Sequence, residues 1–506
     1  MEPVLVVGAG PTGLVTALSL ARRGIPVRIV DRKDGPARES RAMGLHARSL
    51  EYYRQFGFGD AVVERGVVAD SIAFRSGNRD ITRFSLADMG AGLSPYPFLL
   101  AFPQDEHERF LLDRLRELGV AVEWEVSLDD VAEVGDKVEA VLRWRDGTQR
   151  STHPYVVGCD GAHSRVREVL GIGFPGGDSD QLFYVADAIV PGSDHGPIYF
   201  AFQEAGLALM MPVRSTGTQR LMGFAPLEAR SKTDVGFEDV RGHVESLLGI
   251  DVGDVNWFST YRVHHRVAES FQRGRIFIAG DAGHIHSPAG GQGMNTGIGD
   301  AVNLSWKIAE VLHRRADPVL LDTYQAERLP FARSLIATTD RVFKFLVDDG
   351  RLAQLVRVHI APHVISTVAR FTASRRQIFR TVSQTRLSYR TCHFNQGRAG
   401  GIRGGDRLPW VTFPGGDNFA ALQSLSWQLH VYGEPGAAVV KAADDLALDL
   451  WRFDFGECAE SAGLQRDAAY LVRPDGYVAL AMAPGHTTEL TSYVQRWALQ
   501  LSPFAR

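Results

Sequence analysis

Cysteine is scarce in this chain, and the three that occur, Cys159, Cys392 and Cys458, lie far apart in the 506-residue sequence. No two of them form a CxxC or CxxxxC pair, which excludes a sequence-local dithiol redox couple and a cysteine-rich zinc site. So few thiols are typical of an intracellular, reducing compartment, and we expect a cytoplasmic protein.

Long apolar runs and an excess of one charge are also lacking. No stretch of 18 apolar residues occurs, so we predict no transmembrane helix, and the apolar run Val4–Val7 is too short for a signal-peptide core. The chain has 55 Lys and Arg against 59 Asp and Glu, a net charge of −4. Because nucleic-acid binding needs a concentrated basic face, we expect neither a nucleic-acid nor a membrane partner.

Glycine, in contrast, is abundant, with 52 residues. A first cluster is the GxGxxG loop Gly8–Gly13, which an expected strand at 4–7 precedes and an expected helix at 12–23 follows. A second expected strand, 27–31, ends at Asp31, whose carboxylate can accept hydrogen bonds from a ribose diol. This context predicts a dinucleotide whose pyrophosphate lies at the helix N-terminus, but it does not separate FAD from NAD.

A second glycine cluster follows an expected strand at 275–279 and opens a helix, Met294–Arg314. It contains Gly280-Asp281, Pro288 and the run Gly291-Gln292-Gly293-Met294-Asn295, and a separate segment, 158–167, contains Asp160-Gly161. Together with Ser40-Arg41-Ala42 and 103–108, these motifs resemble the FAD-dependent aromatic hydroxylases of the para-hydroxybenzoate hydroxylase fold. The resemblance spans about residues 1–340. More weakly, 397–506, with its stretch Leu471–Ala479, resembles the thioredoxin-like domain of the phenol hydroxylase and aromatic polyketide hydroxylase branch.

The resemblance implies an FAD site and assigns residues to it. Reduced flavin carries negative charge near N1 and C2=O, which the free N–H groups and positive end of the Met294 helix stabilise. The implied cofactor-binding residues are Gly8, Gly10, Pro11, Thr12 and Gly13 at the pyrophosphate, Asp31 and Arg32 at the adenosine, Arg41, Gln104 and Asp281 at the flavin or ribityl chain, Asp160 beneath the pyrophosphate, and Pro288, Gly291, Gly293, Met294 and Asn295 at the isoalloxazine ring.

The expected elements predict a fold of mixed class, α/β with α+β. A Rossmann-type FAD-binding domain with the GxGxxG loop would carry an inserted antiparallel-sheet substrate domain, and a thioredoxin-like domain would close the chain. The predicted domains are 1–175, of which 70–103 contributes to the substrate side; 176–265 for the substrate; 266–396 for the second FAD-binding part and connecting helices, with 331–390 mainly helical; and 397–506, which lacks CxxC.

Two residue groups support more than one interpretation. The spacing of His284 and His286 suggests a metal, but no third ligand is local and the segment already matches a flavin loop, so we predict no metal site. Four apolar side chains between 176 and 265 fit either an aromatic-substrate pocket or sheet core: Phe200, Phe202, Met210 and Phe224.

The resemblance also implies a reaction. NADPH or NADH would reduce FAD, oxygen would form a flavin C4a-hydroperoxide, and this species would hydroxylate a phenolic ring. We favour a polycyclic polyketide of antibiotic biosynthesis as substrate. Alternatives are a phenol or phenylpropanoid hydroxylase in catabolism, a Baeyer–Villiger oxygenase on the same scaffold, and a non-catalytic FAD-binding partner protein. No catalytic side chain is predicted, and both a monomer and a homodimer fit.

Overall fold

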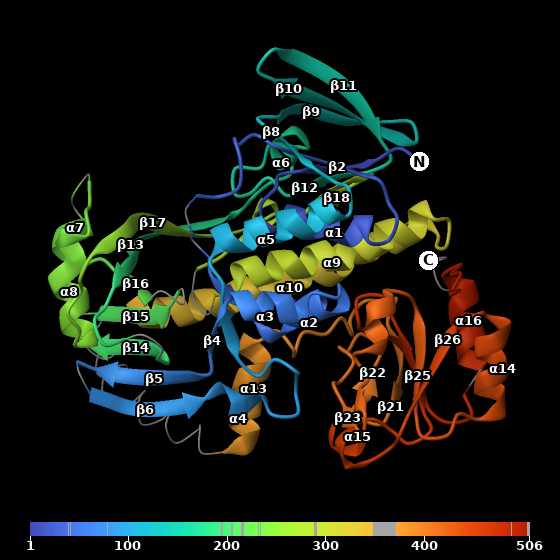
Figure 1. Ribbon diagram of the computed structural model, residues 1–506. Coiled ribbons are helices and arrows are strands. Elements are labelled where there is room, and N and C mark those ends of the chain that lie inside the picture. Colours follow the sequence, from blue (N-terminus) through green and yellow to red (C-terminus); the bar gives the residue numbers. More distant parts are fainter. Residues whose placement is uncertain are drawn as a thin grey trace.

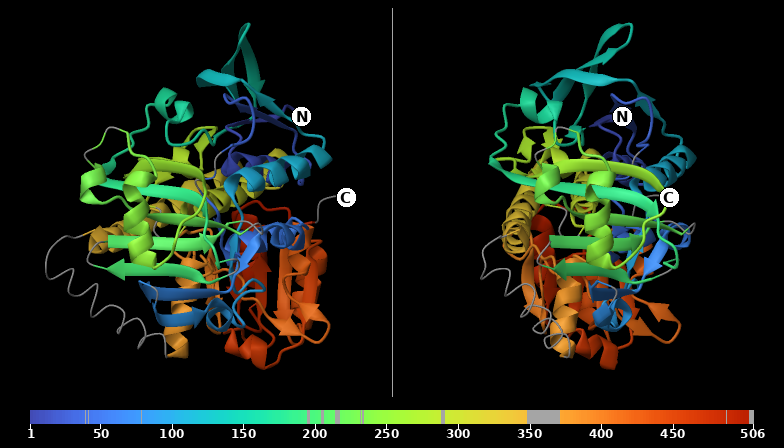
Figure 2. Two further views of the ribbon diagram at one scale, coloured as in Figure 1. Left: turned by 60° about the vertical axis from the view of Figure 1, so that its left-hand side comes forward. Right: turned by 90° about the vertical axis from the view of Figure 1, so that its left-hand side faces the viewer.

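The computed structural model describes residues 1–502 except 39, 41, 78, 194–195, 204–205, 214–216, 231, 233, 288–290, 348–370 and 487. Three large sheets organise these residues (Figure 1). Figure 2 shows that a small sheet of β9, β10 and β11 projects at one end of the molecule and that the C-terminal sheet lies at the other. Among the described residues, no helix combines the length and the apolar character that crossing a bilayer requires.

The first large sheet is six-stranded and parallel except for its edge strand β18. Strand β1 is apolar at every position and fully buried, as expected for a parallel strand covered on both faces. The predicted strands and helices of this region are confirmed within two residues. In spatial order the strands are β18 (Gln272–Arg273), β19 (Ile276–Ile278), β12 (Val156–Gly158), β1 (Val4–Val7), β2 (Val27–Asp31) and β8 (Val122–Trp124).

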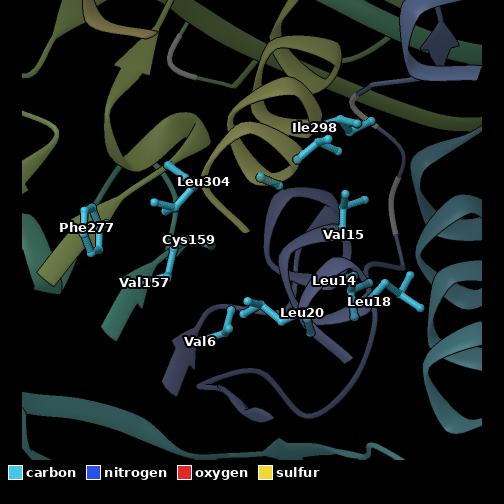
Figure 3. Packing of buried hydrophobic residues seen from close by; sticks show 14 of the residues in the cluster. Val6, Leu14, Val15, Leu18, Leu20, Val157, Cys159, Phe277, Ile298 and Leu304 are labelled. Carbon is cyan, nitrogen blue, oxygen red and sulfur yellow. The ribbon is translucent and has the colours of Figure 1, made fainter. Parts of the chain in front are cut away.

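Three helices lie side by side on one face of this sheet: α1 (Pro11–Ala21), α5 (Gln104–Glu117) and α9 (Gly293–Leu312) (Figure 1). The hairpin strands β9 (Ser127–Val134), β10 (Lys137–Trp144) and β11 (Gly147–His153) lie on the opposite side. Figure 3 shows side chains of α1 and α9 packed with those of the strands. One core therefore joins the two glycine-containing helix starts; it includes Val6, Leu14, Val15, Leu18, Val157, Cys159, Phe277, Ile298 and Leu304.

The second large sheet has eight strands and combines residues from 71–85, 176–267 and 284–285. The sequence predicted an antiparallel sheet here. The structure differs in one place, because β14 pairs in parallel with β5. Strand β5 enters from a distant segment, so no hairpin fixes its direction relative to β14. In spatial order the strands are β20 (His284–Ile285), β17 (Val255–Val267), β13 (Gly176–Ile189), β16 (Thr218–Phe224), β15 (Gly206–Pro212), β14 (Ile198–Gln203), β5 (Ser71–Ser76) and β6 (Arg79–Ser85).

Shorter elements fill the space between these sheets. Helix α8 (Glu238–Leu248) packs on one face of the eight-stranded sheet through Val240, Val244 and Leu247. The others are β3 (Gly44–Leu45), α2 (Ala47–Gln55), α3 (Gly59–Arg65), β4 (Val67–Ala69), α4 (Leu86–Gly90), β7 (Leu99–Ala101), α6 (Arg165–Val169), α7 (Leu227–Arg230) and the 3-10 turns η1 (Gly280–Ala282) and η2 (Pro318–Leu321).

The C-terminal part begins with helices and ends in a six-stranded sheet. Helices α10 (Asp322–Val347) and α13 (Thr372–Val382) agree with the predicted helical stretch, of which 348–370 lies outside the described residues. The sheet order is β22 (Ile402–Arg403), β21 (Gln396–Ala399), β28 (Val478–Met482), β27 (Ala469–Val472), β25 (Gln428–Tyr432) and β26 (Asp449–Phe453), accompanied by β23 (Thr412–Phe413), β24 (Gly416–Asp417), η4 (Ala421–Ser424), α14 (Ala437–Asp445), α15 (Glu457–Ser461) and α16 (Thr488–Arg496).

The loop between β27 and β28 carries a buried arginine, Arg473, that packs against α9 and α10. The guanidinium of Arg473, which is 0% exposed, donates to Glu327 of α10 (Nη1–Oε1, 2.6 Å) and to Asp475 of its own loop (Nε–Oδ1, 2.9 Å). Lys307 of α9 donates to the same Glu327 at 2.9 Å, and Trp306 donates its indole N–H to Asp475 at 3.1 Å. Ionic contacts thus connect the C-terminal sheet to the helix that carries the second glycine cluster.

Candidate functional site

The GxGxxG loop has two glycines that no other residue can replace without clashes. Gly8 has φ +102°, and a β-carbon there would collide with the carbonyl of Cys159. A β-carbon at Gly13 would collide with the carbonyl oxygen of Gly8, so α1 and β1 approach as closely as their backbones allow. At Gly10, in contrast, no atom of the described residues lies within 4 Å of the β-carbon position, so these residues leave room at the start of α1. Free N–H groups at such a helix start suit a pyrophosphate.

Asp31, at the end of β2, is bonded to the loop itself. Its Oδ2 accepts a hydrogen bond from the Ala9 N–H at 2.7 Å, and Oδ1 accepts one from the Lys33 N–H at 2.9 Å. The carboxylate therefore holds the glycine loop in place, with lone pairs remaining for a ribose. Next to it, Arg32 lines a surface cavity of about 370 Å³ together with Trp144.

Asp160 follows β12 and lies directly behind Gly8, where its Cα is 2.9 Å from the β-carbon position. Its Oδ2 accepts from the Val166 N–H at 3.1 Å, while the buried Oδ1 has no partner among the described residues. Burial raises the pKa of Asp160, and several hydrogen bonds oppose the rise. From the same segment, Arg167 donates to the carbonyl of Ala282 at 2.9 Å and so connects this loop to η1.

Asp281 lies in η1 and offers an unused acceptor. Its side chain is reached by solvent, and its carboxylate makes no hydrogen bond with any described residue. Protein nevertheless surrounds it closely enough for lost hydration to raise its pKa, against the lowering effect of His284. An exposed carboxylate with no hydrogen-bond partner among the described residues fits the hydroxyl groups of a ribityl chain.

The N-terminus of α9 has no side-chain cap at its predicted flavin-facing end. Gln292 precedes the helix without capping it through its side chain, and Gly291 has φ +61°. The side-chain amide of Asn295 is occupied by protein: Oδ1 accepts from the His46 N–H (2.9 Å) and Ser49 Oγ (2.7 Å), and Nδ2 donates to the carbonyls of Gly44 (2.8 Å) and Gly291 (3.0 Å). Only the backbone of Asn295 is therefore left to contact a ligand.

Gln104 begins α5 beside the Ser40–Ala42 segment. Its backbone N–H donates to Ser40 Oγ at 2.9 Å, and its Nε2 donates to Glu108 at 2.8 Å. Two further predicted site residues, Arg41 and Pro288, lie outside the described residues.

Thr12, which the sequence placed only in the loop, connects the two glycine clusters. Its Oγ1 lies 2.5 Å from the β-carbon position of Gly280 and still closer to that of Gly297. Both positions therefore require glycine. The first loop, the Asp281 turn and the start of α9 consequently meet at one place, as the predicted cofactor site requires.

The predicted substrate residues separate onto two faces of the eight-stranded sheet. Met210 lies on the α8 face and is 1% exposed in the core with Tyr184 and Leu221, which favours the sheet-core alternative. Phe200 and Phe224 lie on the other face: Phe200 stacks on Phe74 (centroids 5.8 Å apart) and Phe224 contacts Phe183 edge-on (5.5 Å). Phe202 is in β14, and its side chain lies outside the described atoms.

The face of the eight-stranded sheet that carries Phe200 and Phe224 lies next to Ser40. Asp187 and Arg220 are paired neighbours on it and form a buried bidentate ion pair, with nitrogen–oxygen distances of 2.7 and 2.8 Å. Arg220 also extends Nη1 to Ser40 Oγ at 3.4 Å. Arg220 thus connects the aromatic face of the sheet to Ser40, which precedes the predicted flavin residue Arg41.

The two histidines of the second cluster have separate partners. His284 Nε2 lies 2.6 Å from Asp300 Oδ2, and His286 Nδ1 lies 2.7 Å from the Ser287 carbonyl. Across the described part of the chain, no three His, Cys, Asp or Glu side chains converge as metal ligands would.

Comparison with known proteins places the chain in a class. Residues 1–339 match the protein family described as FAD binding domain, and the chain belongs to this family. It is 34% identical over 536 residues to the 6-methylpretetramide 4-monooxygenase of Streptomyces rimosus, covering 99% of this chain and 94% of that protein.

Solved structures agree over the whole length. The anhydrotetracycline hydroxylase OxyS of Streptomyces rimosus superimposes with a TM-score of 0.77 at 28% identity, covering 100% of both chains. The flavin-dependent monooxygenase PieE, solved with FAD and substrate, gives a TM-score of 0.80 at 26% identity and 98% coverage of both chains. The chain is an FAD-dependent aromatic monooxygenase with NADPH or NADH as reductant.

Proposed function

We propose that this enzyme hydroxylates a polycyclic phenolic substrate of the polyketide type in antibiotic biosynthesis. The observation that carries the proposal is the broad aromatic face of the eight-stranded sheet, which adjoins the Ser40–Ala42 segment through Arg220. Stacked and edge-on aromatic rings suit a flat ring system more than a single ring. The activities of the relatives on pretetramide and anhydrotetracycline skeletons support the same substrate class.

The described residues fit FAD through open backbone and unused acceptors. We propose that Gly8, Gly10 and Gly13 receive the pyrophosphate, Asp31 the ribose, Asp281 the ribityl hydroxyls, and the first N–H groups of α9 the flavin carbonyl. When bound, FAD takes a hydride from NAD(P)H and supplies activated oxygen for hydroxylation. The chain itself orients the phenol on the aromatic face and excludes water from the reacting atoms.

The architecture around that site follows the same proposal. We assign residues 1–175 and 266–396 to a Rossmann-type FAD-binding domain, 176–265 with part of 70–103 to the substrate domain, and 397–506 to a thioredoxin-like domain. A monomer and a homodimer both satisfy this arrangement.

The substrate class is tested by product analysis. The purified enzyme with NADPH and oxygen is given a panel of one-ring phenols and of naphthol- and anthrone-type polycyclic phenols, and products are identified by mass spectrometry and NMR. We expect addition of one oxygen atom to a ring carbon of the polycyclic phenols. Turnover confined to one-ring phenols, or an oxygen inserted beside a carbonyl as an ester, would contradict the proposal.

Replacing Asp281 with alanine is expected to weaken FAD binding by about 1–3 kcal/mol, since charged hydrogen bonds to the ribityl hydroxyls are lost. The dissociation constant is measured from the quenching of FAD fluorescence. Asp136→Ala, at an exposed turn between β9 and β10, is the matched control and should bind FAD normally. Equal affinities of the two variants would remove Asp281 from the cofactor site.

A further inference from the structure

Asp300, two turns into α9, joins three separate segments through one carboxylate. Its Oδ2 accepts hydrogen bonds from the Gly280 N–H at 3.0 Å and from His284 Nε2 at 2.6 Å. Its Oδ1 accepts from Arg328 Nε of α10 at 2.5 Å. The side chain is 1% exposed. Asp300 therefore binds the η1 turn on both sides of Asp281 and fixes it to α9.

The carboxylate is ionised and compensated. Burial alone would raise its pKa, but Arg328 and His284 outweigh burial and lower the pKa of Asp300 to about 2. Arg328 is itself 0% exposed and donates to the Thr296 carbonyl in the first turn of α9 and to Tyr389 Oη, each at 3.0 Å. The same pair of charges thus contacts both the Asp281 turn and the open start of the helix.

The turn requires glycine at position 280. Gly280 has φ +63°, which glycine adopts readily, and Thr12 occupies the space in which a β-carbon would lie. The carboxylate of Asp281 makes no hydrogen bond with a described residue. The bonds of Asp300 to Gly280 and His284 tie the turn to α9, while Arg167 ties Ala282 to the Asp160 segment.

We propose that Asp300 is a positioning residue for FAD, which sets the distance between the ribityl-binding Asp281 and the flavin-facing N-terminus of α9. Its carboxylate is enclosed by Gly280, His284 and Arg328, and its role in FAD binding rests on the proposed function of Asp281. Its effect on FAD is independent of which phenol the enzyme hydroxylates.

The test separates positioning from stability with paired variants. In Asp300→Leu/Arg328→Met both charges are replaced by apolar groups, which often preserves stability, while the bonds to Gly280 and His284 are lost. In Asp300→Asn/Arg328→Met an amide oxygen remains for Gly280. The control, Glu310→Leu/Arg315→Met, removes another buried ion pair at the far end of the same helix, where Arg315 Nε lies 3.1 Å from Glu310.

Two readouts are measured on each holoenzyme: FAD release on dilution, followed by fluorescence, and the flavin midpoint potential, alongside thermal unfolding. We expect the leucine variant to bind FAD on the order of tenfold more weakly than the asparagine variant and the control, with a shifted potential. Equal FAD affinity and potential in all three would overturn the proposal. If the leucine variant does not fold, His284→Gln supplies the comparison: it should also weaken FAD binding, and normal FAD binding and potential would overturn the proposal.

Discussion

Replacing Arg473 with methionine is expected to lower the free energy of unfolding by about 3–5 kcal/mol, because a buried ion pair loses one member and leaves the other uncompensated. Arg473 bridges Glu327 and Asp475 and contacts the Asn395 side chain at 3.1 Å, without any exposure to solvent. Its guanidinium also lies 5.2 Å from the ring of Trp306. Methionine fills similar volume but leaves Asp475 without its cation. Urea unfolding followed by far-UV circular dichroism gives the value.

A matched control lies in the same C-terminal part. Arg452 pairs with Glu434 at 2.7 Å on the surface, with side chains 56% and 88% exposed. Because exposed ion pairs contribute at most about 1 kcal/mol, Arg452→Met should change the free energy of unfolding little. Equal decreases in the free energy of unfolding for Arg473→Met and Arg452→Met would show that the buried contacts of Arg473 stabilise the fold no more than an exposed ion pair does.

The second large effect is a loss of stability in mild acid. Two histidines, His107 and His430, are each 0% exposed, and burial lowers the pKa of each to about 3. Tyr53 Oη lies 2.8 Å from His107 Nε2, and Gln428 Oε1 lies 2.7 Å from His430 Nε2, contacts that neutral imidazoles satisfy. Below about pH 6.5 the unfolded chain binds protons at these positions and the folded chain does not, so stability falls as pH falls.

The expected size follows from the two sites together. Each histidine contributes a loss of about 2 kcal/mol between pH 7 and pH 5, so the pair contributes about 4 kcal/mol. The measurement compares the wild type with His107→Gln/His430→Gln by urea unfolding at both pH values. Other acids titrate alike in both proteins, so the difference in pH dependence isolates the histidines. Parallel pH profiles would show that neither imidazole is held neutral.

The sequence predicted the parts of the site whose chemistry is local. The tight turn at Gly8 and the close packing at Gly13 depend on neighbouring residues in one strand–loop–helix unit, and the structure shows both clashes that make glycine necessary. The start of α9, which has no side-chain cap, likewise depends on residues of its own segment. The roles of Asn295 and Met210 depend instead on which distant segment packs beside them, and the sheet face of Met210 follows from strand register.

The buried charges were missed for a related reason. Asp300, Lys307 and Glu310 lie on a helix that is buried almost throughout, yet their partners come from 315, 327–328 and beyond. A charged residue in an otherwise apolar helix indicates a buried ion pair, because charged side chains are almost never fully buried without a partner. Which partners they are is set by tertiary packing alone, and no spacing along the chain encodes it.

The insertion of the Arg473 loop also orders events during synthesis. Domains emerge from the ribosome N-terminal part first, so Glu327 and Lys307 are made long before the cation that completes their cluster. Until residue 473 has emerged, Glu327 has one cationic partner, Lys307, instead of two. The hydrogen bond between Trp306 of α9 and Asp475 is then also absent. The contacts that tie α9 and α10 to the C-terminal sheet can therefore form only after nearly the whole chain has been synthesised.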